Sequence, residues 1–543
     1  RKYNAKIMAS LVKSGLIPIE EYDVQLSKQL ENTTQIQLVE FSVELLNYCL
    51  FSSQPVTSIE DHLLTIKTLM KLDHNIAKEL IQHLKMQWTE RYKNINPKDD
   101  TFDLRLLLSE WIRLYKHTLT AKSIYNQFAK KILETITKDS DRLCFFFRLC
   151  TEVCVELYQP SKTQYVDAYS KLVSMIIHLS DGSIQMTSQV LSVIVLVMAQ
   201  QQEKLGSQFN QKPFLKLMSS LFIELNNVND DKESFISIYG NVLYTLQPLY
   251  FPGFSYSWLQ LFSHRLFLPL LLKQEKEGWN ICYKLTTALL SFLKLLLTPA
   301  EEHTKLSRST KTFYQGTLRF LVVMLHDYPE FLCSHYLSFI HLLPLGCIQL
   351  RNVILSAFPR TMILPDPFTI TLGYVANNTA SPKLLQVKEE GEESILHECG
   401  VYLSSGHTKM SIGSSLVGYI TSSDKDSSVE KIQNLVFYVG SHTTLDTKKS
   451  LSESPAIQIY KYLLAHFSST QNSFGQHVLL NSIVDHLRYP NSHTYFFSMA
   501  ILHLFNSQPN QIKEQITRIL LERLIVNRPH PWGLLTTFVQ LIK

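Results

Sequence analysis

The chain has 543 residues, of which 45% are hydrophobic and 18% are charged. This length exceeds what one compact core usually organises, so several domains or a repeat array are expected. Its 52 basic and 47 acidic residues are interspersed and leave a net charge of only +5, which excludes a chain-wide basic field for nucleic acid but not a local basic patch.

The chain opens with Arg1 and without a cleavable leader pattern, so we expect it to be a piece of a longer protein. Its eight cysteines are few for this length, and they favour the reduced thiols of a cytosolic or nuclear protein over a disulfide framework. The closest pair, Cys150 and Cys154, has helical spacing in an apolar run. We expect core thiols there and no metal site.

Helical periodicity begins early and recurs along the chain. In the stretch from 99 to 119, apolar residues recur at helical spacing from Leu104 to Tyr115, and Asp100 or Thr101 can cap the start. The same spacing predicts that Arg105 lies on the wet face of this helix. A second striped segment, 121–137, follows after a short break, so the two helices form an antiparallel pair. Repetition of this pattern predicts an all-α chain of degenerate helical hairpins of roughly 40 residues.

Two runs are apolar enough to raise the question of a membrane. The run 190–199 is shorter than the ~20 residues that a bilayer needs, and the run 281–297 carries Lys284 and Lys294. Both are therefore expected to be buried helices. Directly afterwards, "TPAEE" from Thr298 to Glu302 has the cap, proline and acidic residue that favour a helix start.

Three polar groups could suggest chemistry, and each has a simpler interpretation. His326, Asp327 and Glu330 lie where an apolar helix is expected to end at Pro329, and His264 is expected to cap a neighbouring helix end. The glycine frame "GSSLVGY" has Tyr419 where a phosphate loop requires lysine. We therefore predict no catalytic, cofactor-binding or metal-binding residues, and no small-molecule substrate.

Residues 371–431 contain six of the seventeen glycines together with acidic and serine-rich pieces, which favours a flexible insert or linker. Near the end, a stripe from Ile512 to Leu524 predicts a helix that must stop before Pro529. Pro531 suits the start of another helix. The segment "NRPHPWG" is therefore predicted to be a tight corner, with Trp532 packed over it and Arg528 bonding the last carbonyls of the first helix.

Five long motifs carry a family resemblance. They are "YFPGFSYSWLQLFSHRLFLPLLL" (250–272), "FYQGTLRFLVVMLHDYPEFLC" (313–333), "CIQLRNVILSAFPRTMILPDPFT" (347–369), "HLRYPNSHTYFFSMAILHLF" (486–505) and "EQITRILLERLIVNRPHPWGLLTTFVQLIK" (514–543). The chain closely resembles the C-terminal domain of subunit one of the Not group, the scaffold of the Ccr-Not mRNA deadenylase complex. The opening from Ala5 to Leu46 looks like a diverged start of the same domain.

The resemblance implies a HEAT-like helical-hairpin repeat solenoid without catalytic activity or cofactors. It implies docking of the second and the third (or fifth) Not subunits, with RNA-bound repressors and RNA as further contacts, and no membrane. The process implied is mRNA deadenylation and decay, translational repression and transcription regulation, in the cytoplasm including P-bodies and in the nucleus. Within this one domain, we expect repeats over 1–240 and 241–370, the insert over 371–431, and further repeats over 432–543.

Apolar segments that cannot be helical are the best candidates for partner contacts. In "PRTMILPDPFT" three prolines prevent a helix, while the apolar side chains between them need burial, against a partner or along the solenoid itself. "LRYPNSHT" and "NRPHPWG" are further candidates. The predicted partner-binding residues are Met362, Ile363, Leu364, Pro365, Asp366, Phe368, Arg488, Tyr489, Arg528, His530 and Trp532. The alternative function is direct RNA binding through Lys71, Lys78, Lys85, Arg91 and Lys93.

Overall fold

The fold is helical throughout the part of the chain that the computed structural model describes. That part excludes residues 1–2, 33–34, 52–56, 93–100, 117–121, 137–139, 161–162, 181–182, 229–230, 303–305, 370–392, 406–411, 422–424 and 444–453. The described residues form α-helices with short 3₁₀ turns and contain no β-strand. They divide into two compact units, 1–281 and 282–543. The predicted divisions at 240, 370 and 431 do not coincide with this boundary.

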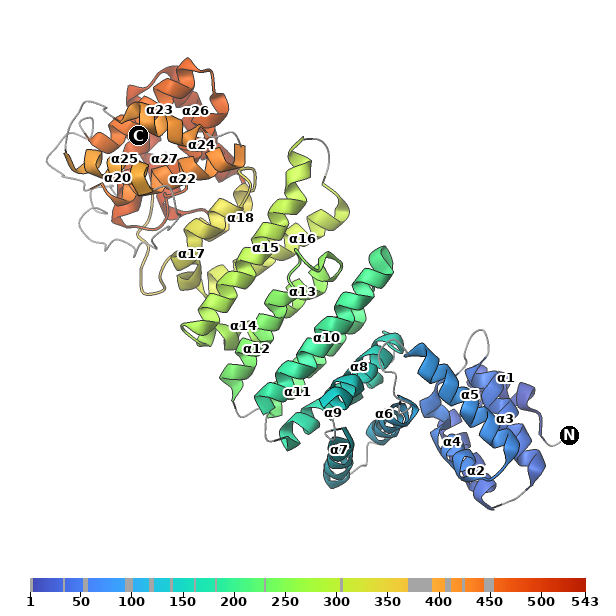
Figure 1. Cartoon of the computed structure of the whole chain (residues 1–543). Helices are drawn as coiled ribbons and strands as arrows, with labels where there is room; N and C mark the ends of the chain where they lie inside the picture. Colours follow the sequence, from blue (N-terminus) through green and yellow to red (C-terminus); the bar gives the residue numbers. More distant parts are fainter. Residues whose placement is uncertain are drawn as a thin grey trace. The chain divides into compact units, whose positions relative to one another are not determined.

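The first unit is a series of helices joined by short connections (Figure 1). The helices are α1 (Ala5–Lys13), α2 (Ile19–Asn32), α3 (Ile36–Leu50), η1 (Ile59–His62), α4 (Leu63–Lys71), α5 (Asn75–Arg91), α6 (Thr101–Lys116), α7 (Lys122–Ile136), α8 (Ser140–Glu156), α9 (Gln164–Leu179), α10 (Ser183–Leu205), η2 (Gly206–Gln208), α11 (Lys212–Val228), α12 (Lys232–Thr245), η3 (Pro252–Phe254), α13 (Ser255–Phe262) and α14 (Phe267–Lys273).

Helices two positions apart in the chain pack side by side. In the middle of the first unit, α8, α10, α12 and α14 form one layer, while α7, α9, α11 and α13 form the other. The same alternation joins α1, α3 and α5 on one side and α2 with α4 on the other. Each hairpin thus buries its apolar stripe against its neighbours, as a repeat solenoid does. The predicted all-α fold of helical-hairpin repeats is confirmed.

The second unit opens with the rest of α15 (Glu277–Glu302), which begins in the first unit. Its other helices are α16 (Arg308–Asp327), α17 (Pro329–Leu342), α18 (Ile348–Leu355), α20 (Glu393–Ser405), α21 (Gly413–Ile420), α22 (Lys425–Ser441), α23 (Pro455–Ser469), α24 (Ser473–Val484), α25 (Ser492–Ser507), α26 (Asn510–Ile525) and α27 (Trp532–Ile542). One continuous apolar core joins α20 through α27.

Two predictions about local structure were wrong. The sequence "TPAEE" does not start a helix, because α15 continues through it to Glu302, and α16 starts instead at the cap Ser307, whose Oγ accepts the Thr310 N–H at 3.0 Å. The stretch 371–431 is not only a linker, because α20, α21 and the start of α22 lie in it. Glycine there permits close packing: a Cβ on Gly400 would lie 2.6 Å from the Tyr438 hydroxyl. The remainder, 370–392, 406–411 and 422–424, lies outside the described residues.

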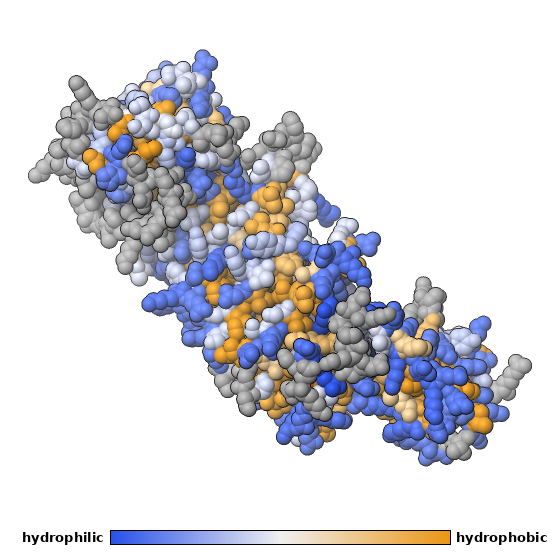
Figure 2. Space-filling model, viewed as in Figure 1, coloured by the Kyte–Doolittle hydropathy of each residue, from blue (hydrophilic) through white to orange (hydrophobic). Residues whose placement is uncertain are grey.

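Two helices in the described part are long and apolar enough to cross a membrane by length and composition alone, Ile184–Gln208 and Glu277–Thr298. Each has a buried stripe, which includes Ile194 and Met198 in the first and Leu289 and Leu293 in the second. The first also packs between α8 and α12. This is the pattern of core helices in a repeat array. Figure 2 shows apolar residues also gathered on the surface of the middle helices of the first unit. Leu196 is one exposed apolar side chain of α10.

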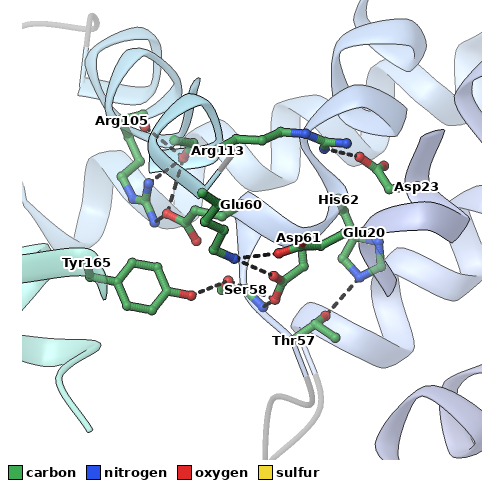
Figure 3. Close-up of polar contacts among 12 residues, drawn as sticks. Glu20, Asp23, Thr57, Ser58, Glu60, Asp61, His62, Arg105, Arg113 and Tyr165 are labelled. Carbon is green, nitrogen blue, oxygen red and sulfur yellow. Dashed lines mark hydrogen bonds and ion pairs between the residues drawn. The ribbon is translucent and has the colours of Figure 1, made fainter. Parts of the chain in front are cut away.

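Charged side chains are buried inside the first unit (Figure 3). Arg105, on α6, pairs with Glu60 of η1, and both side chains are almost inaccessible. Burial alone would raise the pKa of the Glu60 carboxyl, but the charge of Arg105 keeps that pKa below its usual value. The prediction that Arg105 lies on a wet face was therefore wrong. A charged residue can take a core position when a partner neutralises it.

Asp23, on α2, belongs to the same group of buried charges and connects α2 to α4 and α6. Its carboxylate accepts the N–H groups of Leu64 and Thr65, both at 3.0 Å, and so caps the start of α4. It also pairs with Arg113 of α6 at 2.5 Å. The cluster therefore fixes α2, η1, α4 and α6 together. Its carboxylates are engaged in capping and ion pairs, which is a structural arrangement.

Candidate protein-docking surface

A proline-rich loop follows α18 and exposes apolar side chains. Pro359, Pro365 and Pro367 prevent a helix, as predicted, and the segment 357–369 has no helical residues. The side chain of Ile363 is 93% exposed and that of Phe368 is 61% exposed. Met362, Leu364 and Pro365 are half-buried, and Asp366 is exposed. Apolar side chains that gather at one place on a surface mark a candidate interaction site.

The loop forms one wall of an apolar groove with a volume of about 710 Å³. The opposite walls come from the end of α16, the start of α17, the corner between α26 and α27, and α27 itself. All of these elements belong to the second unit. The lining residues are Val322, Leu325, His326, Pro329, Ser356, Phe358, Arg360, Leu364, Pro365, Asp366, Pro367, Pro529, His530, Trp532 and Leu535.

The corner predicted for "NRPHPWG" is confirmed. Helix α26 ends at Ile525 and α27 begins at Trp532, whose side chain is buried. The Trp532 indole N–H donates to the carbonyl oxygen of Pro365 at 2.7 Å, so the corner and the loop are joined directly. Arg528 is exposed, and its guanidinium makes no hydrogen bond to a described residue. Its predicted bond to the end of α26 is therefore not found in the described part.

The charged groups around the groove are largely engaged with one another. The Glu330 carboxylate accepts the backbone N–H of Arg360 at 3.0 Å, and the Arg360 guanidinium donates to the carbonyl oxygens of His326, at 3.2 Å, and Asp327. The His326 ring contacts the Asp327 carboxylate at 2.7 Å. These polar residues lie at the end of a helix, as expected, and Arg360 binds them there. Burial and the nearby charge of Arg528 lower the pKa of His530, which favours its neutral form. The groove therefore suits an apolar ligand.

Arg488 and Tyr489 were predicted as partner contacts, but they are buried. The guanidinium carbon of Arg488 lies 3.5 Å from the centre of the Tyr336 ring, and its Nη2 donates to the Cys333 carbonyl oxygen at 3.4 Å. These contacts fasten the connection between α24 and α25 to α17. The prediction was wrong because the cation–π stack on Tyr336 satisfies, inside the protein, the charge that we expected to face a partner.

A buried ionic cluster joins the helices that precede the loop and the corner. The Asp485 carboxylate binds Arg351 of α18 at 2.8 Å and Arg523 of α26 at 2.6 Å. Arg523 also donates to the Asn481 side chain at 2.7 Å, and Arg351 donates to the Leu343 carbonyl oxygen at 3.0 Å. Because the loop follows α18 and the corner follows α26, Asp485 joins the two helices that lead into the loop and the corner.

The other candidate sites have structural roles. "GSSLVGY" is helix α21, and the His264 ring accepts the Leu266 N–H at 3.3 Å in the turn before α14. Cys150 and Cys154 are buried in α8, where burial raises the pKa of both thiols. No group of three or more histidine, cysteine, aspartate or glutamate residues in the described part could hold a metal ion.

Four of the five residues behind the RNA-binding alternative lie on α4 and α5. Lys78 pairs with Asp73 and Arg91 pairs with Glu156, so two of these charges already have an acidic partner at the surface. Lys71 and Lys85 are exposed, and Lys93 lies outside the described residues. Direct RNA binding stays a prediction that needs a measurement.

Sequence reasoning missed the groove walls outside the loop and the corner. Val322, Leu325 and Leu535 were assigned to ordinary apolar helices, and Phe358 and Arg360 were not singled out. The available signal was the run "RFLVVML", which has more apolar residues than one buried stripe can use. In the structure Val322 and Val323 are 43% and 46% exposed.

Comparison with known proteins decides the family. A family model described as "CCR4-Not complex component, Not1" matches residues 217–543, which is more than half of the chain. The chain belongs to the Not1 family. A second model, described as "Cnot1 ARM repeat", matches residues 1–87. The family resemblance that the motifs carry is thus confirmed, and the chain is a domain of a scaffold subunit of the CCR4-Not complex.

Curated relatives are much longer than this chain. It is 28% identical, over its whole length, to General negative regulator of transcription subunit 1 of Schizosaccharomyces pombe. It is 30% identical, over 83% of its length, to CCR4-NOT transcription complex subunit let-711 of Caenorhabditis elegans. The matched parts span 28% and 19% of those two relatives.

Two solved structures of the Not1 family share the fold. One is a Not1 C-terminal domain in complex with Not4, with a TM-score of 0.65 and 26% identity, covering 81% of this chain and 95% of that one. The other is the NOT1 superfamily homology domain from Chaetomium thermophilum, with a TM-score of 0.66 and 25% identity, covering 81% and 92%.

Proposed function

We propose that this domain is a non-catalytic dock for other Not subunits, the second and the third (or fifth), and that the docking surface is the groove with the loop 357–369. In this role it supports deadenylation and decay of mRNA, translational repression and transcription regulation, in the cytoplasm including P-bodies and in the nucleus. The observation that carries the proposal is the exposure of Ile363 and Phe368, 93% and 61%, beside an apolar groove of about 710 Å³.

The energetics favour an apolar segment as the ligand. Burying a side chain such as isoleucine or phenylalanine contributes about 1.5–3 kcal/mol. Binding orders an extended peptide and so costs conformational entropy, which a few well-buried anchors must exceed. Ile363 and Phe368 are two such anchors on this chain, and the groove beside them can accept side chains from the partner.

The choice of a Not subunit as partner rests on the family and on one neighbour. The similar Not1 C-terminal domain was solved in complex with Not4, which supports a Not subunit as the kind of partner for this fold. The second and third (or fifth) subunits are proposed from the family resemblance, and Not4 serves as a separate arm of the test.

The test is co-elution on size-exclusion chromatography, followed by calorimetry. The chain is mixed at moderate salt with the C-terminal regions of the second and third (or fifth) Not subunits, or with Not4. We expect one complex, and we expect the Ile363→Glu, Phe368→Glu double variant to bind at least about tenfold more weakly, because two buried charges replace two anchors.

The matched control is Leu295→Glu. Leu295 is also well exposed, at 59%, but lies on α15 and is not among the residues that line the groove. It should bind like the unmodified chain. Equal affinity of the folded double variant and the control would remove the loop from the interface, and absence of any complex would reject the function itself.

A further inference from the structure

The loop 357–369 exposes its apolar side chains and yet is fixed at several points. An irregular loop of this kind would normally lose conformational entropy on binding. Here prolines restrict the backbone at three positions, 359, 365 and 367. Short-range bonds add to this, because the Met362 N–H donates to the Pro359 carbonyl oxygen at 2.9 Å and the Phe368 N–H donates to the Asp366 carboxylate at 3.0 Å.

Arg360 fastens the start of the loop to the junction of α16 and α17. Its backbone N–H donates to the Glu330 carboxylate at 3.0 Å, and its guanidinium donates to the carbonyl oxygens of His326 and Asp327. These carbonyls end α16, where the helix dipole favours a positive charge. The side chain of Arg360 therefore has a fixed position although it lies at the surface.

Trp532 fastens the middle of the loop to the core. Its indole N–H donates to the Pro365 carbonyl oxygen at 2.7 Å, and only 5% of the residue is exposed. The next residue, Gly533, donates its backbone N–H to the Arg488 carbonyl oxygen at 2.5 Å, so α27 is itself anchored. Neither clamp uses the side chain of Ile363 or Phe368.

We infer that Trp532 and Arg360 are positioning residues, which hold the loop in its docking conformation before the partner arrives. This inference rests on the proposed function, in which Ile363 and Phe368 make the contact. It assigns the two clamps a separate role: they reduce the entropy that binding would otherwise cost. They differ from the contact residues because their effect must be visible in the free protein.

The experiment measures hydrogen exchange in the free chain and affinity for the Not subunits in parallel. Trp532→Phe keeps a ring but removes the indole N–H, and Arg360→Met keeps the aliphatic stem but removes the guanidinium. We expect each to speed exchange of the loop amides by roughly three- to tenfold and to weaken partner binding by a similar factor, the value of one lost hydrogen bond.

Trp279→Phe is the matched control. Its indole N–H also donates to a carbonyl oxygen, that of Leu272 at 3.1 Å, but far from the loop in sequence and in the first unit. It should change neither loop exchange nor affinity. Arg360→Met serves as the second variant if Trp532→Phe lowers stability, because Arg360 is exposed.

The outcomes separate the two proposals. Unchanged loop exchange in both clamp variants would overturn the inference, and so would faster exchange with affinity equal to that of the unmodified chain. If the unmodified chain fails to bind any Not subunit, the proposed function is rejected, and the exchange rates still decide whether the two residues hold the loop.

Discussion

Two proline-containing connections of the second unit, 357–369 and 485–491, contain similar kinds of residue. They differ in how far those residues are exposed to solvent. Both contain proline, arginine and an aromatic residue, and partner contacts were predicted in both. In the first, Ile363 and Phe368 are exposed, whereas in the second Arg488 and Tyr489 are buried. The difference arises because other elements cover the second connection: Tyr336 of α17 stacks on Arg488, and Gly533 of α27 donates to its carbonyl oxygen.

This comparison shows that composition cannot separate a docking loop from a structural one. What separates them is the number of neighbours that a connection receives from distant parts of the chain. Changes in 485–491 should therefore destabilise the fold, and changes to the exposed side chains of 357–369, Ile363 and Phe368, should leave stability unchanged and affect binding. The following variants test that division.

The largest loss of stability is expected for Asp485→Ala. It leaves the guanidinium groups of Arg351 and Arg523 buried without their shared carboxylate, which costs about 3–5 kcal/mol in the free energy of unfolding. Urea unfolding measures this loss. Asp327→Ala is the control, since its partner His326 is exposed, and it should cost at most about 1 kcal/mol. Similar losses in both variants would mean that the buried Asp485 cluster contributes no more to stability than an exposed ion pair.

Gly533→Ala should come next, with a loss of about 3 kcal/mol from overpacking. A Cβ at Gly533 would lie 2.8 Å from the Arg488 carbonyl oxygen and 2.8 Å from the Leu487 carbonyl carbon, which are backbone atoms that cannot easily move. No heavy atom lies within 4 Å of a Cβ built on Gly346. Gly346→Ala should therefore unfold like the unmodified chain, and equal midpoints for the two variants would contradict the close approach of α27 to this connection.

Arg488→Met should lower the unfolding free energy by about 2 kcal/mol, the value of a desolvated cation–π contact. The methionine keeps much of the apolar stem but loses the stack on Tyr336 and the bond to Cys333. Below its melting temperature the variant should bind Not subunits with unchanged affinity. A loss of binding without a loss of stability would indicate that Arg488 contacts the partner after all.

Acidification should destabilise the covered connection. Burial holds the pKa of His486 well below its usual value and, with the charge of Arg488 nearby, lowers the pKa of His493 to about 4. The unfolded chain binds protons on these rings below about pH 6.5 while the folded chain does not, so stability is full above pH 6.5 and falls toward pH 4. The expected slope is up to about 1.4 kcal/mol per pH unit for each ring. His493→Gln should reduce that slope in urea unfolding, and an unchanged slope would exclude His493.

The smallest effect on stability is expected for Ile363→Glu with Phe368→Glu. Both side chains face solvent, so the unfolding free energy should change by less than about 0.5 kcal/mol, even though partner binding weakens. A large loss of stability in this double variant, measured by the same urea titration, would mean that the loop belongs to the fold as much as the covered connection does.

Local patterns predicted much of this molecule. The stripe from Ile512 to Leu524 and the prolines that follow gave the end of α26 and the corner before α27, because helix periodicity and proline geometry act within a few residues. The exposure of Ile363 and Phe368 agrees with the idea that the loop has no helix in which to bury them.

Predictions failed where a distant partner decides. Arg105 is buried because it pairs with Glu60, which lies 45 positions away in sequence. Arg488 is buried because α17 covers it. The helices between 393 and 420 were missed because glycine indicates either a linker or close packing, and only the neighbour, such as Tyr438 beside Gly400, distinguishes the two. The groove was missed for the same reason, since its walls come from separate elements.

The contacts around Asp485 also determine when the second unit can fold during synthesis on the ribosome. Arg351 meets its carboxylate 134 positions later, and Asn352 donates to the Arg523 carbonyl oxygen 171 positions later. At a translation rate of about 5–20 residues per second, the last contact partner of α18 is synthesised roughly 9–34 s after α18 itself. Hairpins of the first unit, which pack mainly on near neighbours, can fold as they emerge. The second unit, which carries the dock, thus depends more than the first on partners that are synthesised later.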